Sequence, residues 1–192
     1  YTHVGAILVA VNPFERLDIY NKSEMVKATN NAFIKPYPHV FVTAATAFGQ
    51  LRKNRINQSV LISGESGAGK TETTKKVLSF LADMAPSATV KQEGEPGVED
   101  KILQSNPLLE SLGNAKTLRN DNSSRFGKWM KVGFNVNIAI QGCEIVNYLL
   151  EKSRVVTQTP MERNYHIFYF LLAGSDKALR ANLKIPPGAG PL

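Results

Sequence analysis

The chain has 192 residues, of which 43% are hydrophobic, so it is long enough and apolar enough to form a folded core, and a disordered or low-complexity protein is excluded. Its 23 basic and 16 acidic residues give a net charge of +7, but the charges are dispersed, with no run of one sign and no basic helix interleaved with aromatic residues, so we expect no nucleic-acid partner. The longest apolar stretches are much shorter than a membrane span, so we expect no membrane insertion either.

The N-terminal stretch is expected to hold a strand and then a loop. A continuous apolar run at Gly5–Val11 predicts a buried strand, and Pro13 ends it because proline lacks a backbone donor and restricts the residue before it. The loop that follows, Asn12–Tyr20, is called the N-terminal loop below. Its amide, guanidinium and phenol side chains suit contact with a planar base, and they suit an ordinary surface turn as well, so the residues alone leave both interpretations open.

Two helices are expected next. Ser23–Thr29 predicts a short one, and Lys35–Pro38, with its two prolines, predicts an extended connector. Between His39 and Arg55, apolar residues recur at helical spacing up to a basic turn, which complements the C-terminal end of a helix. We therefore expect a second helix there, packed against a core.

The most specific pattern is the glycine-rich loop, Gly64–Thr71, whose sequence GESGAGKT fits G-x-x-x-x-G-K-[ST]. Glycines let the backbone bend until its N–H groups reach anionic oxygens. A β-branched run at Asn57–Ser63 predicts a strand entering the loop, and Lys70–Met84 predicts a helix leaving it, whose N-terminus faces the same anion. A glycine-rich turn that merely resembles the motif would not need these flanking elements. We expect Lys70 to reach the β- and γ-phosphates of a nucleotide and Thr71 to ligate Mg²⁺.

The middle of the chain is predicted to hold a flexible surface loop at Pro86–Val98 and then a helix at Glu99–Leu112. A break in this helix is expected at Asn106-Pro107 and a stop at Gly113-Asn114. The next segment, Ala115–Gly127, is called the polar loop below, because it is dense in hydroxyls, amides and arginines and almost empty of apolar residues. It is an ordinary hydrophilic loop or, in a chain that binds phosphate, a segment that ligates Mg²⁺ and senses the γ-phosphate.

The C-terminal part begins with predicted strands. Lys128–Asn135 and Val136–Gln141 favour a β-hairpin, and a further strand is expected at Ile145–Leu150. Cys143 is the one cysteine, so it cannot form a disulfide within the chain, which fits a reducing compartment. We expect it to be a small core residue.

Two helices close the chain. Glu162–Gly174 predicts one with an aromatic stripe in the core and Gly174 as its C-terminal cap, and Ser175-Asp176 is expected to cap a shorter helix through Ala181. We interpret His166 as a structural histidine rather than a catalytic one, since the sequence names no partner for it. The chain starts within an extended pattern and ends in a Pro/Gly-rich stretch, so we expect it to be a piece of a longer sequence.

Several of these stretches together resemble the motor domain of myosins. Gly64–Lys75 resembles the phosphate loop of that family, and Asn120–Lys128 resembles its switch I. Asn106–Glu110, Leu150–Val156 and Glu162–Tyr169 are further matches in the expected order, so that the resemblance covers essentially the whole chain. It implies an α/β fold, the P-loop NTPase core of a myosin motor head, in which helices flank a central twisted mixed sheet that is incomplete here. Residues 1–192 would be part of a single motor domain, with no complete second domain.

The resemblance also implies site residues in three stretches. Nucleotide binding is expected at these positions: Asn12, Pro13, Arg16, Tyr20, Gly64, Glu65, Ser66, Gly67, Ala68, Gly69, Lys70, Thr71 and Glu72. Catalysis is expected to involve the following: Lys70, Asn120, Ser123, Ser124 and Arg125. Among these, Thr71 and Ser124 match Mg²⁺ ligands, and Asn120 and Ser123 match residues that hold the phosphates and position the attacking water. Arg125 matches an arginine that pairs with a glutamate of switch II when the site closes. Switch II is not found in this sequence, so that glutamate cannot be supplied here.

The activity implied by the resemblance is that of a motor ATPase. Its substrate would be ATP, its cofactor Mg²⁺, its partner the actin filament, and its location cytoplasmic and associated with the cytoskeleton. Light chains or calmodulin would bind only through a lever arm outside these residues, and the isolated chain should hydrolyse little ATP. An alternative is a nucleotide-regulated interaction module without productive hydrolysis. A small-molecule kinase or a GTPase fits less well, because we find neither an acceptor site nor the guanine-specifying Asn-Lys-x-Asp element.

Overall fold

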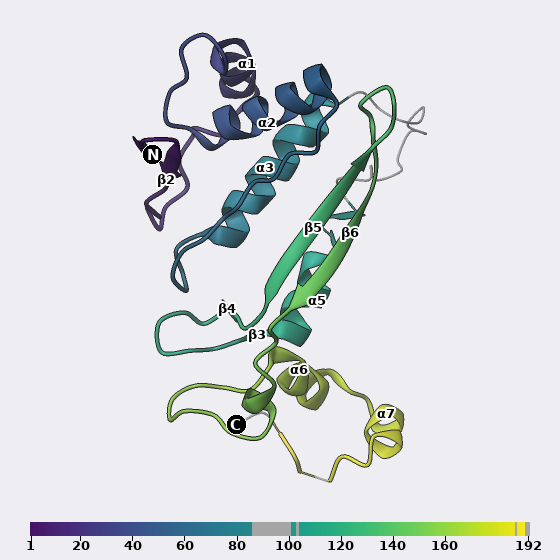
Figure 1. Ribbon diagram of the computed structural model, residues 1–192. Coiled ribbons are helices and arrows are strands. Elements are labelled where there is room, and N and C mark those ends of the chain that lie inside the picture. The colour runs from purple at the N-terminus through teal and green to yellow at the C-terminus, as the bar shows by residue number, and fades with distance from the viewer. Residues whose placement is uncertain (86–100, 103, 187, 191–192) are drawn as a thin grey trace. The chain divides into compact units, whose positions relative to one another are not determined.

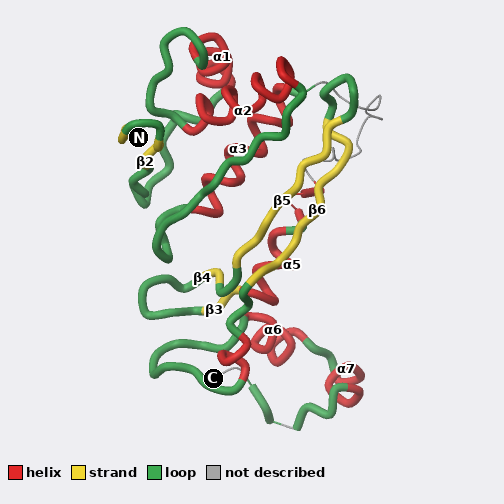
Figure 2. The backbone as a smooth tube through the Cα atoms, viewed as in Figure 1, coloured by secondary structure: helices red, strands yellow, loops and turns green. Residues whose placement is uncertain are grey.

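The computed structural model of the chain describes residues 1–85, 101–102, 104–186 and 188–190, and the surface loop expected at Pro86–Val98 lies outside them (Figure 1). The chain divides into two compact units, which are described separately below. The first consists of Tyr1–Leu103 and Val132–Glu144, and the second of Gln104–Lys131 and Ile145–Leu192. Helices and strands are mixed (Figure 2), and none of the described helices has the length and hydropathy needed to cross a membrane.

The first unit opens with a small hairpin in which β1 (Thr2–Val4) pairs with β2 (Ile7–Val9) in antiparallel register. The single buried strand predicted at Gly5–Val11 is therefore wrong. Gly5 adopts a φ of +60°, which glycine tolerates because it has no Cβ, and this turn reverses the chain. The apolar side chains beside the turn are mostly exposed, so the run is apolar without being core.

Three helices build the core of the first unit. They are α1 (Lys22–Asn31), α2 (Val40–Asn54) and α3 (Lys70–Met84), and α2 packs against both of the others (Figure 1). The predicted helices are thus confirmed, the third with the expected bounds. The core side chains that they share include the following: Met25, Ala28, Val40, Phe41, Ala44, Val77 and Phe80.

The strand predicted at Asn57–Ser63 is not present. A strand exists only as part of a ladder with a neighbour, and no described strand pairs with these residues, which form an extended connector between α2 and α3. Two of its apolar side chains, those of Val60 and Leu61, are exposed, the latter at 89%. The described residues form three two-stranded sheets, so the larger mixed sheet that the resemblance implies stays a prediction.

A long hairpin joins β5 (Gly127–Phe134) to β6 (Ile140–Tyr148). The predicted hairpin and its first strand are confirmed, but the second strand, predicted at Val136–Gln141, starts four residues later because residues 135–139 form the turn. The prediction of two separate strands after the turn is wrong, because β6 continues without a break. The turn between β5 and β6 is closed by the backbone amide of Asn135, which donates to the carbonyl of Ala139 at 3.0 Å. Cys143 lies in β6 half-buried rather than in the core, and this partial burial raises the pKa of its thiol.

The second unit contains α5 (Asn106–Gly113), which starts at the predicted break with proline in its first turn and ends at the predicted stop. Directly after it, β3 (Asn114–Ala115) pairs with β4 (Ser123–Ser124). The polar loop is therefore closed as a narrow hairpin, with its two short strands at the base (Figure 2).

The C-terminal elements are a 3-10 turn, η1 (Lys152–Val155), and two helices, α6 (His166–Gly174) and α7 (Lys177–Asn182). The prediction starts α6 four residues too early, and Ser175 rather than Gly174 is its C-cap. No residue of α6 is buried, so the predicted aromatic core stripe is wrong for this helix, although Tyr165 directly before it is buried. The helix α6 packs on α5. The predicted cap of α7 is confirmed, since Asp176 accepts a hydrogen bond from the amide of Leu179 at 2.7 Å.

Candidate functional site

The glycine-rich loop is shaped by backbone conformations that only glycine adopts without strain. Gly67 and Gly69 have φ values of +82° and +92°, in the left-handed region that a Cβ disfavours. Gly69 is the N-cap of α3 and has no side chain to cap the helix. The first backbone N–H groups of α3 therefore donate no hydrogen bond to a capping side chain and remain available to a ligand at the glycine-rich loop. The helix dipole places partial positive charge at the same point. This is the geometry of an anion site.

Lys70, the first residue of α3, closes the loop from its inner side. Its ammonium donates to the carbonyls of Gly64 at 2.7 Å and Glu65 at 2.9 Å. A lysine ammonium has three donors, so one remains for a ligand. The positive charge of Lys70 is thereby held next to the glycine-rich loop, close to the N-terminus of α3.

Three threonines follow in α3, and they differ in what their hydroxyls do. Those of Thr73 and Thr74 donate to the carbonyls of Gly69 and Lys70, at 2.9 and 3.0 Å. The hydroxyl of Thr71 has no hydrogen-bond partner in the part of the chain that the structure describes. Thr71 is thus the member of this group whose oxygen is available to a metal ion or a phosphate.

The N-terminal loop is attached to the glycine-rich loop by Asn12. The amide nitrogen of Asn12 donates to the carbonyl of Gly67 at 2.8 Å, and its amide oxygen accepts from the backbone of Phe14 at 3.0 Å. Two segments 55 residues apart are therefore brought together within the first unit. Pro13 and Arg16 are exposed in the same loop, so they are accessible to a ligand.

The other end of the N-terminal loop is fixed by Tyr20. Its hydroxyl shares a hydrogen bond of 2.7 Å with that of Tyr1, and its ring packs at 5.9 Å from the ring of Phe41 in the core. The ammonium of Lys76, one turn and a half into α3, lies 4.5 Å from the centre of the Tyr20 ring. The loop is thus held at both ends by the elements that form the anion site.

His39, which the sequence analysis did not single out, supports the same end of the loop. Its Nδ1 accepts from the amide of Phe41 at 3.0 Å, so Nε2 carries the proton and donates to the carbonyl of Ile19 at 2.9 Å. Burial lowers the pKa of His39 and keeps it neutral. The available signal was its position directly before an apolar helix, where a capping side chain is expected.

The polar loop of the second unit presents its two serines in opposite directions. Ser123 is 1% exposed, whereas Ser124 is on the exposed face, as the alternation of a strand requires. The hydroxyl of Ser124 donates to the carbonyl of Phe126 at 3.1 Å. Asn120 turns the loop, because its amide oxygen accepts from the backbone of Asn122 at 3.0 Å and its carbonyl accepts from Thr117 at 2.9 Å.

Asn122 connects the polar loop to the helices α5 and α6. Its amide oxygen accepts from Asn114 and from Nε2 of His166, both at 3.0 Å, and its amide nitrogen donates to Glu110 at 3.0 Å. This gives His166 the partner that the sequence did not supply. Burial lowers the pKa of His166, which favours the neutral form in this bond.

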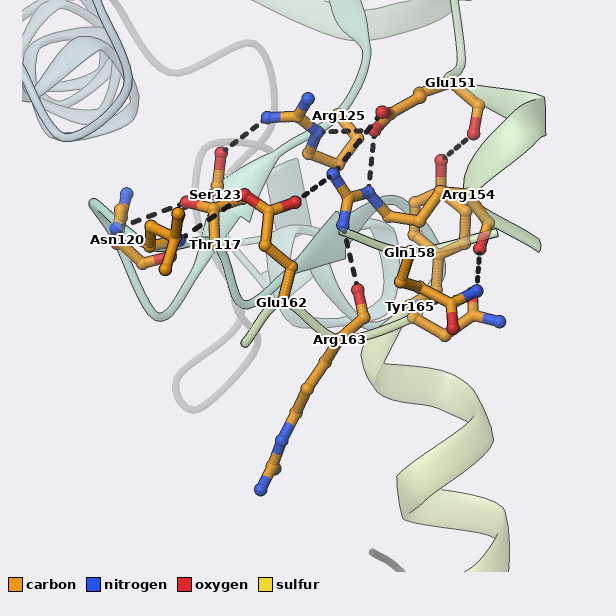
Figure 3. Close-up of polar contacts among 12 residues, drawn as sticks. Thr117, Asn120, Ser123, Arg125, Glu151, Arg154, Gln158, Glu162, Arg163 and Tyr165 are labelled. Atoms are coloured by element: carbon orange, nitrogen blue, oxygen red, sulfur yellow. Dashed lines mark hydrogen bonds and ion pairs between the residues drawn. The ribbon is translucent and has the colours of Figure 1, made fainter. Parts of the chain in front are cut away.

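Arg125 ends the polar loop and is held from two sides (Figure 3). Its Nε donates to Glu151 at 2.7 Å and its Nη1 donates to the hydroxyl of Ser123 at 3.2 Å. Glu151 is thus an acidic partner of Arg125 that the sequence did not indicate, and it is not the switch II glutamate that the resemblance implies. Glu151 was missed because a contact between residues 26 apart in the sequence depends on how the second unit folds. The hydrogen bond from Arg125 is the main reason why the pKa of Glu151 is lowered.

The base of the polar loop depends on a glycine. The ring of Phe126 occupies the space that a Cβ at Gly113 would need, so a larger residue would displace it. The amide of Arg125 also donates to the carbonyl of Gly113 at 2.9 Å. The end of α5 and the end of the polar loop are therefore locked together.

The donor set fits a nucleotide accompanied by Mg²⁺ rather than a metal held by the protein alone. No group of three or more His, Cys, Asp or Glu side chains suited to a metal occurs among the described residues. A hydroxyl oxygen such as that of Thr71 is suitable for Mg²⁺ when phosphate oxygens supply the remaining ligands. Turned amides and the ammonium of Lys70 suit the phosphates themselves.

The comparisons with known proteins give one family. The sequence profile of the family described as "Myosin head (motor domain)" matches residues 1–189. The chain is 51% identical to unconventional myosin IC of Drosophila melanogaster over 96% of this chain and 18% of that protein. It is 52% identical to unconventional myosin-Ic of Rattus norvegicus, with 94% and 17% covered, and 51% identical to myosin type-2 heavy chain 1 of Schizosaccharomyces pombe, with 95% and 12% covered. The chain thus spans less than a fifth of the length of these relatives, and it belongs to the myosin head (motor domain) family.

Proposed function

We propose that the chain is the nucleotide-binding part of an actin-based motor. It would have the P-loop NTPase core of a motor head, bind Mg·ATP, and in the complete protein hydrolyse ATP and couple this to force on actin filaments. The observation that carries the proposal is the glycine-rich loop, in which Gly67 and Gly69 turn the backbone and Lys70 is held at the mouth by two loop carbonyls. Membership of the myosin head family supports the same function.

In this proposal the loop amides and the first turn of α3 bind the phosphates, and the remaining donor of Lys70 bridges the β- and γ-phosphates. The hydroxyls of Thr71 and Ser124 would hold Mg²⁺, which neutralises the charge that develops on the phosphate oxygens. Glu65, Ser66, Ala68 and Glu72 complete the phosphate-binding stretch.

The N-terminal loop would receive the purine through Asn12, Pro13, Arg16 and Tyr20. The hydrogen bond from Asn12 to Gly67 supports this, because it holds the loop beside the glycine-rich loop. Asn120 and Ser123 would hold the γ-phosphate and orient the attacking water, and Arg125 would stabilise the charge of the transition state. The protein's contribution to the reaction is then positioning and electrostatics.

The partners follow from the family. Actin filaments would bind mostly through regions other than these residues, and the protein would be cytoplasmic and associated with the cytoskeleton. Light chains or calmodulin would bind through a lever arm in the complete protein. These proposals rest on the relatives being myosins.

The test is nucleotide binding by the wild-type protein and by Lys70→Ala, followed with a fluorescent ATP analogue. We expect Mg·ATP to be preferred over Mg·GTP, and Lys70→Ala to weaken ATP binding by about a hundredfold or more because a direct phosphate contact is lost. Lys53→Ala removes the same charge from the exposed end of α2 and should leave the affinity unchanged. Unchanged affinity in Lys70→Ala, or a preference for GTP, would contradict the proposal. ATP binding without phosphate release in the complete protein would favour a nucleotide-regulated interaction module instead.

A further inference from the structure

Four charged residues of alternating sign form a continuous row of ion pairs in the second unit (Figure 3). Arg125 Nε lies 2.7 Å from Glu151 Oε2, and Arg154 Nε lies 2.7 Å from the same carboxylate oxygen. Arg154 Nη2 then reaches Glu162 Oε2 at 2.8 Å. The side chain of Arg154 is only 4% exposed, so the ion pairs in the middle of this row are shielded from water. One carboxylate, that of Glu151, thus serves two arginines.

Glu151 is fixed by contacts to its backbone as well as its side chain. Its amide donates to the carbonyl of Arg125 at 3.0 Å, and its own carbonyl accepts from the hydroxyl of Tyr165 at 2.7 Å. Its carboxylate cannot turn away without removing a partner from the buried guanidinium of Arg154, which is costly. Arg154 is itself held by a bond from Nη1 to the carbonyl of Arg163 at 3.0 Å. The position of the Glu151 carboxylate is therefore determined by contacts other than the one to Arg125.

The consequence for Arg125 is a fixed orientation. A guanidinium is planar, so holding Nε at Glu151 and Nη1 at the hydroxyl of Ser123 determines the plane and rotation of the whole group. Nη2 makes no hydrogen bond within the residues that the structure describes and remains available. Because the hydroxyl oxygen of Ser123 accepts from Arg125, its own proton points elsewhere. The orientation set at Glu151 is thus transmitted through Arg125 to the Ser123 hydroxyl.

We propose that Glu151 is a positioning residue for ATP hydrolysis, which acts by holding Arg125 and, through it, the hydroxyl of Ser123 in the reactive geometry. This inference rests on the proposed function. The competing explanation is that Glu151 only neutralises Arg154 and so stabilises the fold. The two explanations separate because Glu162 neutralises the same Arg154 from its other side and makes no bond to Arg125.

The experiment compares Glu151→Gln with the matched control Glu162→Gln in the complete motor, by single-turnover ATP hydrolysis and by ATP affinity. We expect Glu151→Gln to slow the hydrolysis step about tenfold or more, as small misplacements of a reacting group do, while ATP affinity stays the same. Glu162→Gln should hydrolyse ATP at the wild-type rate. Equal slowing in both variants, or a wild-type rate in Glu151→Gln, would overturn the positioning role.

A double-mutant cycle with Arg125→Ala tests whether Glu151 acts through Arg125. If it does, adding Glu151→Gln to Arg125→Ala slows hydrolysis no further, and a further slowing by the full factor would overturn the inference. Should Glu151→Gln fail to fold, Glu151→Asp keeps the charge beside Arg154 while withdrawing the carboxylate by one carbon, and it should slow hydrolysis in the same way. A wild-type protein that does not hydrolyse ATP would refute the proposed function, and the positioning role with it.

Discussion

The two units hold their parts of the candidate site by different forces. In the first unit the glycine-rich loop leads into α3, and α3 is anchored in an apolar core where the fully buried rings of Phe41 and Phe80 lie 5.5 Å apart. In the second unit the polar loop is held by hydrogen bonds and ion pairs through Asn122, Arg125 and Arg154, and the helix α6 beside it buries no residue.

This difference indicates which part is suited to rearrange. Apolar burial has no alternative partner, so a segment anchored by it keeps one position. A hydrogen bond at the surface can be exchanged for another at small net free energy, since each is worth about 1 kcal/mol in water, whereas the buried ion pairs of Arg154 are costly to break. We therefore expect the glycine-rich loop to be the more rigid of the two loops and the polar loop to be the one that rearranges more readily.

The largest expected effect is in the apolar core. Phe80→Ala should lower the free energy of unfolding of the first unit by about 4 kcal/mol, because it removes a fully buried ring and leaves a cavity. Phe168→Ala makes the same change in α6 of the second unit, where Phe168 is 41% exposed. It should lower the free energy of unfolding of that unit by about 1 kcal/mol or less. Hydrogen exchange at peptides from α3 and α6 measures both. Equal losses at the two positions would remove the contrast between the units.

Arg154→Ala tests the polar side of the comparison. It leaves the carboxylates of Glu151 and Glu162 without their shared cation, and we expect the second unit to lose about 3 kcal/mol of stability. Urea unfolding followed by the fluorescence of Trp129, the only tryptophan, reports on this unit. Lys152→Ala, at an exposed position of η1, removes the same charge and is the control. If the two variants unfold at the same urea concentration, the ion pairs do not hold the polar loop.

The sequence predicted those features that depend on neighbouring residues. The bounds of α3 follow from a glycine cap and an apolar period, both local, and the cap of α7 follows from Asp176 alone. The stop at Gly113-Asn114 is local too. For the candidate site, the resemblance implied that the N-terminal loop and the glycine-rich loop share one site. In the structure the hydrogen bond from Asn12 to Gly67 joins these two loops.

What the sequence could not predict depends on partners far along the chain. An apolar run such as Asn57–Ser63 becomes a strand only beside another strand, and none of the described strands lies next to it. The helix α6 is rich in apolar and aromatic residues, but none of its residues is buried in the part of the chain that the structure describes. Glu151 was hidden for a related reason, since an arginine and a glutamate pair only once the backbone has brought them within reach.

The smallest effect expected is a pH dependence confined to the first unit. Protonation of His39 on Nδ1 removes the acceptor for the amide of Phe41 and so breaks the cap of α2. Burial lowers the pKa of His39 below its ordinary value of 6.5, so the unfolded chain takes up this proton more readily than the folded one. The stability due to His39 is therefore complete above pH 6.5 and is lost as the pH falls through the lowered folded-state pKa.

His39→Asn isolates this contribution, because asparagine caps helices well and does not titrate. Urea unfolding between pH 7.5 and 5, followed by hydrogen exchange in α2, should show a loss of about 1 kcal/mol or less in the wild type that is absent from the variant. Comparison of the two proteins cancels the titration of every other group, including His166 in the second unit. Parallel pH profiles for the wild type and His39→Asn would contradict this prediction, because the stability of the first unit would then not depend on the protonation of His39.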